Sequence, residues 1–208
     1  MKGKFITFEG SEGSGKTTQI LLLQKYLKKN KSVVFLREPG GTKISEYIRR
    51  ILLDVKNDAM NDRAEMLLYM AARAQLVAQV IRSALQKGKI VLCDRFLDST
   101  IAYQGYGSGV DIALIKRIGE FATQGLKPDL TFFFDLDVKT GFSRIGERAR
   151  DRIEKRALVY HARVHAGFRK IAKNEPRRVK TIPGHLKKSE IQKIIRQHVD
   201  RLLGKSSK

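Results

Sequence analysis

Residues 10–17 have the types and spacing of a loop that holds phosphate groups. They read Gly-Ser-Glu-Gly-Ser-Gly-Lys-Thr and match G-x-x-x-x-G-K-[ST] at every defined position. An apolar run precedes them and a helical pattern begins at Lys16, so backbone N–H groups at a helix N-terminus can point at phosphate oxygens. The sequence therefore predicts a nucleoside triphosphate site formed by Gly10, Ser11, Glu12, Gly13, Ser14, Gly15, Lys16, Thr17 and Thr18.

Two side chains of this phosphate-binding loop (P-loop) have expected roles. Lys16 is expected to reach the β- and γ-phosphates, and Thr17 is expected to place its hydroxyl on Mg²⁺. Such a loop serves ATPases, GTPases, small-molecule kinases and nucleic-acid motors, so it does not choose among them. The chain has no N-K-x-D string of the kind that reads guanine, which weakens the GTPase interpretation.

A second group of charged residues follows the third predicted strand. Asp94 and Arg95 come directly after the apolar run 89–93. Asp94 could hold the water shell of the metal, and the Arg95 guanidinium could bind an acceptor phosphate. Arg37 ends the second predicted strand, at the edge where open α/β sheets bind ligands. These strings leave open a structural Asp–Arg pair and an ordinary turn at Arg37.

Aromatic and polar residues farther along could complete a base-binding pocket. Tyr69 and Arg73 lie four residues apart, on one face of a predicted helix. Their ring and guanidinium could stack on a base and bind its edge, although such a pair is more often a surface contact. Tyr103 and Gln104 follow residues 94–96 closely and could line the same cavity.

Short apolar runs alternate with longer helical patterns along the chain. Strands are predicted at 4–8, 32–36, 89–93, 130–134 and 179–182, and helices at about 16–29, 42–53, 62–86, 111–123, 153–173 and 189–203. This alternation predicts one α/β domain over residues 1–208, a P-loop NTPase fold whose five-stranded parallel sheet is covered by helices on both faces. We expect a loop at 98–109, a mobile lid at about 141–156 and a frayed tail at 204–208.

The charge of the chain is strongly positive and uneven. The net charge is +21, and residues 139–208 contribute +15 of it, with 21 basic and 6 acidic residues. A basic surface favours phosphate-bearing partners, but a solvated lysine-rich surface is the commoner explanation. One cysteine, Cys93, cannot form an internal disulfide. With neither a signal peptide nor an apolar run of ~20 residues, the sequence favours a cytoplasmic protein that does not contact a membrane.

Together, five segments resemble the thymidylate kinase family over essentially the whole chain. They are residues 9–18, 37–42, 67–75, 94–96 with 99–104, and 128–131 running into 136–137. Segments 37–42 (Arg-Glu-Pro-Gly-Gly-Thr) and 94–104 carry the specificity, because the P-loop is shared much more widely. The resemblance implies transfer of the γ-phosphoryl group of ATP to dTMP with Mg²⁺, in a homodimer.

The resemblance also implies roles for individual residues. Three arginines would bind the dTMP phosphate: Arg37, Arg49 and Arg95. Four side chains would contact thymine: Tyr69 by stacking, and Arg73, Thr100 and Gln104 by hydrogen bonds. Glu12 would lie near the deoxyribose 3′-hydroxyl, and Tyr103 would crowd the 2′ position. Tyr69 departs from the Phe that is usual in the family.

Catalytic roles would belong to Lys16, Arg95 and one arginine of the lid. Members of the family stabilise the migrating phosphoryl group with an arginine from either the P-loop or the lid. Residues 11–14 include no arginine, whereas the lid has Arg148 and Arg150. The resemblance therefore implies the form with the lid arginine and leaves open which of the two acts.

Two other functions remain as alternatives. One is another nucleoside monophosphate or deoxynucleoside kinase. The other is a nucleic-acid-binding P-loop protein, which the charge of residues 139–208 suggests, although the sequence has no RNA-binding aromatic signature and no zinc-ligand spacing.

Overall fold

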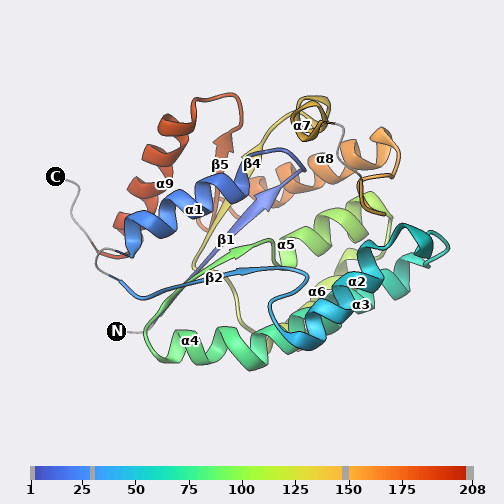
Figure 1. The fold of residues 1–208 in the computed structure, drawn as a ribbon, viewed down its shortest axis with the longest axis horizontal. Helices are drawn as coiled ribbons and strands as arrows, with labels where there is room; N and C mark the ends of the chain where they lie inside the picture. The colour runs from blue at the N-terminus through green and yellow to red at the C-terminus, as the bar shows by residue number, and fades with distance from the viewer. Residues whose placement is uncertain (1–2, 29–30, 147–149, 205–208) are drawn as a thin grey trace.

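The computed structural model describes residues 3–28, 31–146 and 150–204, and a five-stranded sheet forms its centre (Figure 1). The strands are β1 (Lys4–Gly10), β2 (Val33–Arg37), β3 (Ile90–Asp94), β4 (Leu130–Asp135) and β5 (Val179–Pro183). All neighbouring strands are parallel, in the order β2-β3-β1-β4-β5. The predicted five-stranded parallel sheet is confirmed, and each strand begins and ends within two residues of its expected bounds.

Helices connect the strands and cover both faces of the sheet (Figure 1). The α-helices are α1 (Lys16–Leu27), α2 (Lys43–Leu53), α3 (Asp62–Leu76), α4 (Arg82–Gln86), α5 (Leu97–Thr100), α6 (Ile112–Thr123), α7 (Val138–Ile145), α8 (Leu158–Asn174) and α9 (Lys188–Leu202). A 3₁₀ turn, η1 (Val55–Asn57), and two π-helical segments, η2 (Val77–Ile81) and η3 (Ile101–Gly107), complete the order. None of the described helices is long and apolar enough to span a membrane.

Alternate side chains of each strand enter different parts of the core. Ile6 and Phe132 pack with α1 and α9, whereas Phe5 packs with η2 and α4 and Phe133 with α8. All four side chains are at most 1% exposed. Because both faces are buried, most strand residues are apolar, and this is why the strands appear as short apolar runs in the sequence.

The segment 98–109 is helical, so the prediction of a loop there is wrong. It forms most of α5 and all of η3, which packs against α8. Glycines make this contact possible: a Cβ on Gly107 would lie 2.7 Å from the Tyr160 ring, and one on Gly167 would lie 2.6 Å from the Tyr106 ring. The glycines of 98–109 suggest a turn by composition, but Gly107 permits a close approach between two helices.

Three other boundaries differ from the prediction. The helix expected over 62–86 is divided by the π-helical segment η2. The helix expected from residue 153 begins at Leu158, after the turn at 152–155. The first residues of the expected lid lie within the helix α7. Of the expected frayed tail, only Gly204 is among the described residues.

A buried carboxylate joins β1 to the segment that follows β3. Glu9 is 1% exposed and accepts hydrogen bonds from the Phe96 backbone N–H (2.8 Å) and from Ser99 Oγ. Burial, together with the neighbouring Asp98, raises the pKa of Glu9 to about 8 although its hydrogen bonds oppose the rise. Glu9 thus fixes the beginning of α5 against the end of β1.

The pH dependence of stability tests this placement. The folded protein keeps a proton on Glu9 that the unfolded chain releases above its ordinary pKa of 4.5, so the free energy of unfolding should fall as the pH rises from 4.5 through about 8. Glu9→Gln should flatten this fall, measured by chemical unfolding at several pH values. Glu120→Gln, at an exposed position of α6, should leave the slope of the wild type unchanged. An unchanged slope in Glu9→Gln would contradict the assignment.

Candidate active site

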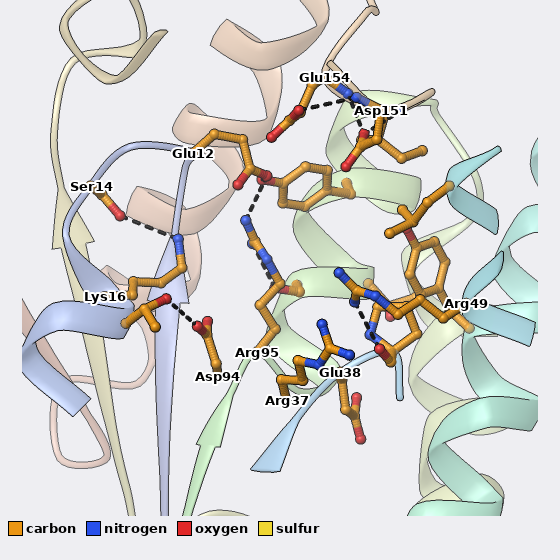
Figure 2. A pocket seen from close by; sticks show the side chains of 18 of the residues that line it. Glu12, Ser14, Lys16, Arg37, Glu38, Arg49, Asp94, Arg95, Asp151 and Glu154 are labelled. Carbon is orange, nitrogen blue, oxygen red and sulfur yellow. Dashed lines mark hydrogen bonds and ion pairs between the residues drawn. The ribbon is translucent and has the colours of Figure 1, made fainter. Parts of the chain in front are cut away.

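One cavity of about 620 Å³ opens at the carboxyl ends of the parallel strands (Figure 2). This is the edge at which open α/β sheets bind ligands. Most of the predicted site residues line it: Glu12, Gly13, Ser14, Gly15, Lys16, Thr17, Thr18, Arg37, Arg49, Tyr69, Arg73, Asp94, Arg95, Thr100, Tyr103 and Gln104. Gly10 and Ser11 do not line it, and their carbonyl groups instead bind Lys16.

Lys16 lies folded into the P-loop at one end of the cavity. Its Nζ donates to the carbonyl oxygens of Gly10 (2.9 Å) and Ser11 (2.8 Å) and to Ser14 Oγ (3.2 Å). Burial and the like charge of Arg95 lower the pKa of Lys16 to about 8. A bound phosphate anion would favour the charged ammonium form. We call this part of the cavity the donor end.

The P-loop backbone needs glycine where it turns beneath α7. Gly13 has φ +67°, and a Cβ built on it would lie 2.0 Å from the carbonyl oxygen of Gly141. Gly15, with φ 88°, directly precedes the first turn of α1. The N-terminus of α1, which is the positive end of its helix dipole, therefore lies at the donor end of the cavity.

Thr17 and Asp94 form a pair of oxygen donors beside the P-loop. Thr17 Oγ1 donates to Asp94 Oδ2 at 2.9 Å, which places the start of α1 next to the end of β3 (Figure 2). Hydroxyl and carboxylate oxygens are ligands that Mg²⁺ accepts while it keeps several waters. The oxygen chemistry of Thr17 and Asp94 therefore fits a Mg²⁺ site, which these two residues would hold.

Arg95 lies between the P-loop and the far part of the cavity, which we call the acceptor end. Its backbone has φ 70°, in the left-handed region that few residues other than glycine adopt. Nη1 donates to the Gly10 carbonyl at 3.0 Å, and Nη2 donates to Glu12 Oε1 at 2.6 Å. The guanidinium carbon lies 5.0 Å from the centre of the Tyr103 ring. Arg95 therefore contacts both the P-loop and η3.

Glu12 is shared between Arg95 and Tyr103. The Tyr103 hydroxyl donates to Glu12 Oε1 at 2.9 Å. Burial by itself would raise the pKa of Glu12, but Arg95 and Lys16 outweigh it and lower the pKa to about 2. Glu12 therefore stays ionised at neutral pH and holds two side chains at the junction of the donor and acceptor ends.

Arg73 is buried at the acceptor end and is fixed by protein groups. Its Nε donates to Glu38 Oε2 at 2.8 Å, and its Nη2 donates to the Phe96 carbonyl and to Thr100 Oγ1, both at 3.0 Å. Burial raises the pKa of Glu38 to about 7, although Arg73 opposes the rise. Sequence reasoning did not assign Glu38 to the site, and its place in the Arg-Glu-Pro-Gly-Gly-Thr string is the signal that could have found it.

Arg37 and Arg49 point into the same part of the cavity as Arg95 (Figure 2). The Arg37 side chain is 52% exposed and pairs with Glu46 at 3.2 Å. Arg49 Nη1 donates to the Pro39 carbonyl at 2.8 Å. Three guanidinium groups from β2, α2 and the end of β3 thus converge at the acceptor end.

Of the two lid arginines, the described one, Arg150, is not brought into the cavity. The Arg150 guanidinium lies 4.8 Å from the centre of the Phe142 ring, and Arg150 does not line the cavity. Arg148 lies outside the described residues. Asp151, Ile153 and Glu154 line the cavity instead, and we had not assigned them to the site. The sequence signal that could have found them is their position directly after Arg150, in the charged segment 141–156.

Known proteins resemble this chain over nearly its full length. A family model described as thymidylate kinase matches residues 8–195. The thymidylate kinase of an Exiguobacterium species is 51% identical over 181 residues, which cover 86% of this chain and 85% of that protein. The thymidylate kinase of a Thermoanaerobacter species is 45% identical over 201 residues and covers 96% of each chain.

A solved structure agrees with these matches. The crystal structure of thymidylate kinase from Ehrlichia chaffeensis matches the fold with a TM-score of 0.79 and 36% identity, and the match covers 96% of this chain and 99% of that one. The five-stranded parallel sheet, the P-loop and the cavity at the carboxyl edge are thus those of a P-loop kinase. The chain belongs to the thymidylate kinase family, whose members are phosphotransferases acting on a nucleoside monophosphate.

Proposed function

We propose that this chain transfers the γ-phosphoryl group of ATP to dTMP and releases ADP and dTDP. The observation that carries the proposal is that one cavity holds two sets of phosphate-binding groups (Figure 2). The P-loop with Lys16 forms one set, and the guanidinium groups of Arg37, Arg49 and Arg95 form the other. Residues able to contact a pyrimidine lie beyond these arginines.

At the donor end, P-loop N–H groups and Lys16 would bind the ATP phosphates. Thr17 and Asp94 would hold Mg²⁺, which supplies charge neutralisation on the phosphates when it is bound. The attacking oxygen of dTMP is already anionic, so no general base is required. The task of the protein groups is therefore to align two phosphates and to stabilise their negative charge.

At the acceptor end, Arg95 is placed to hold the dTMP phosphate opposite the P-loop. Its hydrogen bond to the Gly10 carbonyl fixes its position relative to the donor end. The Glu12 carboxylate would accept a hydrogen bond from the 3′-hydroxyl of the sugar. The Tyr103 hydroxyl, held on Glu12, would leave little room for a ribose 2′-hydroxyl. Together these groups favour a deoxynucleotide.

The base end offers one donor and one acceptor. Four N–H groups of Arg73 donate to protein partners, including the weak acceptor Met70 Sδ at 3.3 Å. The fifth, on Nη1, has no partner among the described residues and could donate to a ligand. Gln104 would accept from N3–H of the base, with the Tyr69 ring stacked on it. Thymine, with a keto oxygen at C4 and a proton on N3, complements this pair.

A panel of monophosphates tests the substrate assignment by coupled ADP release. The value of kcat/KM should be highest for dTMP. It should fall about 10–200-fold for dUMP, since a missing methyl group costs about 1–3 kcal/mol. For CMP and AMP it should fall further, because polar groups of the pocket lose their partners. A reaction without acceptor corrects for ATP hydrolysis. Equal turnover of AMP and dTMP would refute the assignment.

We also propose that a lid arginine, Arg148 or Arg150, reaches the migrating phosphoryl group when the segment 141–156 closes. A lid that excludes water would also prevent hydrolysis of ATP. Arg150 is exposed and contacts the Phe142 ring of α7, and no buried ion pair with the described residues opposes its movement into the cavity.

Single substitutions separate the two lid arginines. Arg148→Ala and Arg150→Ala are compared with Lys155→Ala, an exposed position nearby that does not line the cavity. The variant that removes the acting arginine should lower kcat by on the order of 10³–10⁵ with a much smaller change in KM, because the arginine acts in the transition state. If both variants keep kcat within about threefold of the wild type, the lid arginine is not catalytic.

We propose further that the chain forms a homodimer through α2, α3 and α6. These helices pack side by side (Figure 1) and expose large apolar side chains: Ile44, Tyr47, Ile51, Leu67, Leu114 and Phe121. Phe121 is 85% exposed. A monomer seldom leaves so many apolar groups together in water, whereas a second copy of the same face would cover them.

A charge placed on this face should separate the copies. Phe121→Asp should shift the wild-type dimer to a monomer at micromolar concentration, as measured by sedimentation equilibrium, because the carboxylate would be buried without a partner. Leu21→Asp places the same charge on α1, at a side chain that is 50% exposed, and should leave the dimer intact. A monomeric wild type would rule out the proposal.

A further inference from the structure

A buried glutamate on α3 joins the base end of the cavity to the segment that closes it. Glu65 is fully buried and does not itself line the cavity. Its Oε1 accepts a hydrogen bond from Nε2 of Gln104 at 2.8 Å. Its Oε2 accepts from Nη2 of Arg152 and from Nη2 of Arg156, the latter at 2.9 Å. One carboxylate therefore contacts a residue expected to read the base and two arginines of the expected lid segment 141–156.

This contact decides which end of the Gln104 amide is available to a ligand. A carboxylate has only acceptor oxygens, so it requires the NH₂ end of the amide. The carbonyl Oε1 of Gln104 is the end that remains, and it accepts no hydrogen bond from the described residues. Gln104 lines the cavity and is 1% exposed. The site thus offers a fixed acceptor in a place from which water is largely excluded.

Two arginines lie against the Glu65 carboxylate. Arg152 and Glu65 have side chains that are 5% and 0% exposed, and Arg156 adds a second guanidinium group. Arg152 also donates to the Leu52 carbonyl at 2.8 Å, and Arg156 donates to Ser108 Oγ at 2.8 Å. The Glu65 carboxylate therefore makes ion pairs with two guanidinium groups that further hydrogen bonds hold in place.

We propose that Glu65 is a specificity-determining positioning residue that selects the base through Gln104. By holding the amide NH₂, it presents a carbonyl oxygen to position 3 of the pyrimidine. Thymine and uracil carry a proton on N3 and match this oxygen, whereas N3 of cytosine is itself an acceptor and is repelled. The inference rests on the proposed function, since it requires Gln104 to contact the base.

Glu65→Gln tests the inference, because a neutral amide at 65 accepts either orientation of Gln104. The ratio of kcat/KM for dTMP to that for dCMP should fall about tenfold or more, mainly through a higher KM for dTMP. Arg156→Gln removes a partner of Glu65 but leaves its contact with Gln104. This control should keep the ratio within about threefold of the wild type, whatever its effect on stability.

A double variant serves as the control for a folding defect in Glu65→Gln. Glu65→Gln leaves the buried Arg152 without its anion and removes one of the two carboxylates that Arg156 binds, Asp62 being the other. Glu65→Gln/Arg156→Gln restores the net charge of this cluster and should show the same loss of discrimination as the single variant. Thermal unfolding establishes whether each variant is folded. If Glu65→Gln is not folded, the substrate ratio of the double variant tests the inference.

The possible outcomes distinguish the proposal about Glu65 from the proposed function. A wild type that uses dCMP as well as dTMP contradicts the proposed function. A wild type that prefers dTMP, with a folded variant at 65 that keeps the same ratio, overturns the role of Glu65. An equal loss in Arg156→Gln alone also overturns it, since general loosening would then explain the effect.

Discussion

The hydrogen bonds between Arg95 and the P-loop hold the two halves of the cavity in one geometry. β1 and β3 are neighbours, with Phe8 opposite Asp94, so the P-loop and Arg95 leave the sheet side by side. The left-handed backbone at Arg95 then turns its side chain back over the loop, where the Gly10 carbonyl and Glu12 accept from it. Phosphoryl transfer depends on alignment, and in the proposed reaction this contact would set the separation between the donor and acceptor groups.

A site that binds two polyanions needs cationic side chains that protein groups hold in place while some of their N–H donors stay available to the ligand. Arg95 and Arg73 each bind one carboxylate, Glu12 and Glu38 respectively, and keep donors that a ligand can use. Burial makes such charges costly, so the buried Arg73 has the buried Glu38 beside it, and the partly buried Arg95 has the partly buried Glu12 beside it. The result is a set of preoriented donors, which need little reorganisation when negative charge moves between the substrates.

The excess of positive charge in residues 139–208 is partly structural. Arg152 and Arg156 pair with Glu65, and Arg178 makes two hydrogen bonds to Asp98. These arginines join the region after β4 to α3 and to the start of α5. These arginines form ion pairs within the protein. The net charge counted from the sequence of residues 139–208 therefore overstates how positive the surface of this region is.

The sequence by itself determined the sheet, the P-loop and most of the residues that line the cavity. Short apolar runs and a glycine-rich loop reflect local constraints, namely burial on both faces of a strand and a backbone that curls around phosphate. Segments shared with the family indicated Arg37, Tyr69 and Gln104, and all three line the cavity. Local patterns failed at 98–109, where glycine permits helix packing instead of a turn, because that choice depends on α8, more than fifty residues away along the chain.

Only the tertiary structure decided how the charged groups are paired. No spacing in the sequence shows that Glu38 binds Arg73, or that Glu65 holds both Gln104 and Arg152, because these partners are 35 to 87 residues apart. Pairing at such separations follows from the order of the strands and from the packing of α3 against its neighbours, which bring distant carboxylates and guanidinium groups into one buried space. The physical reason is that a charged group buried in that space is costly unless an opposite charge lies beside it, and the fold decides which residue supplies that charge.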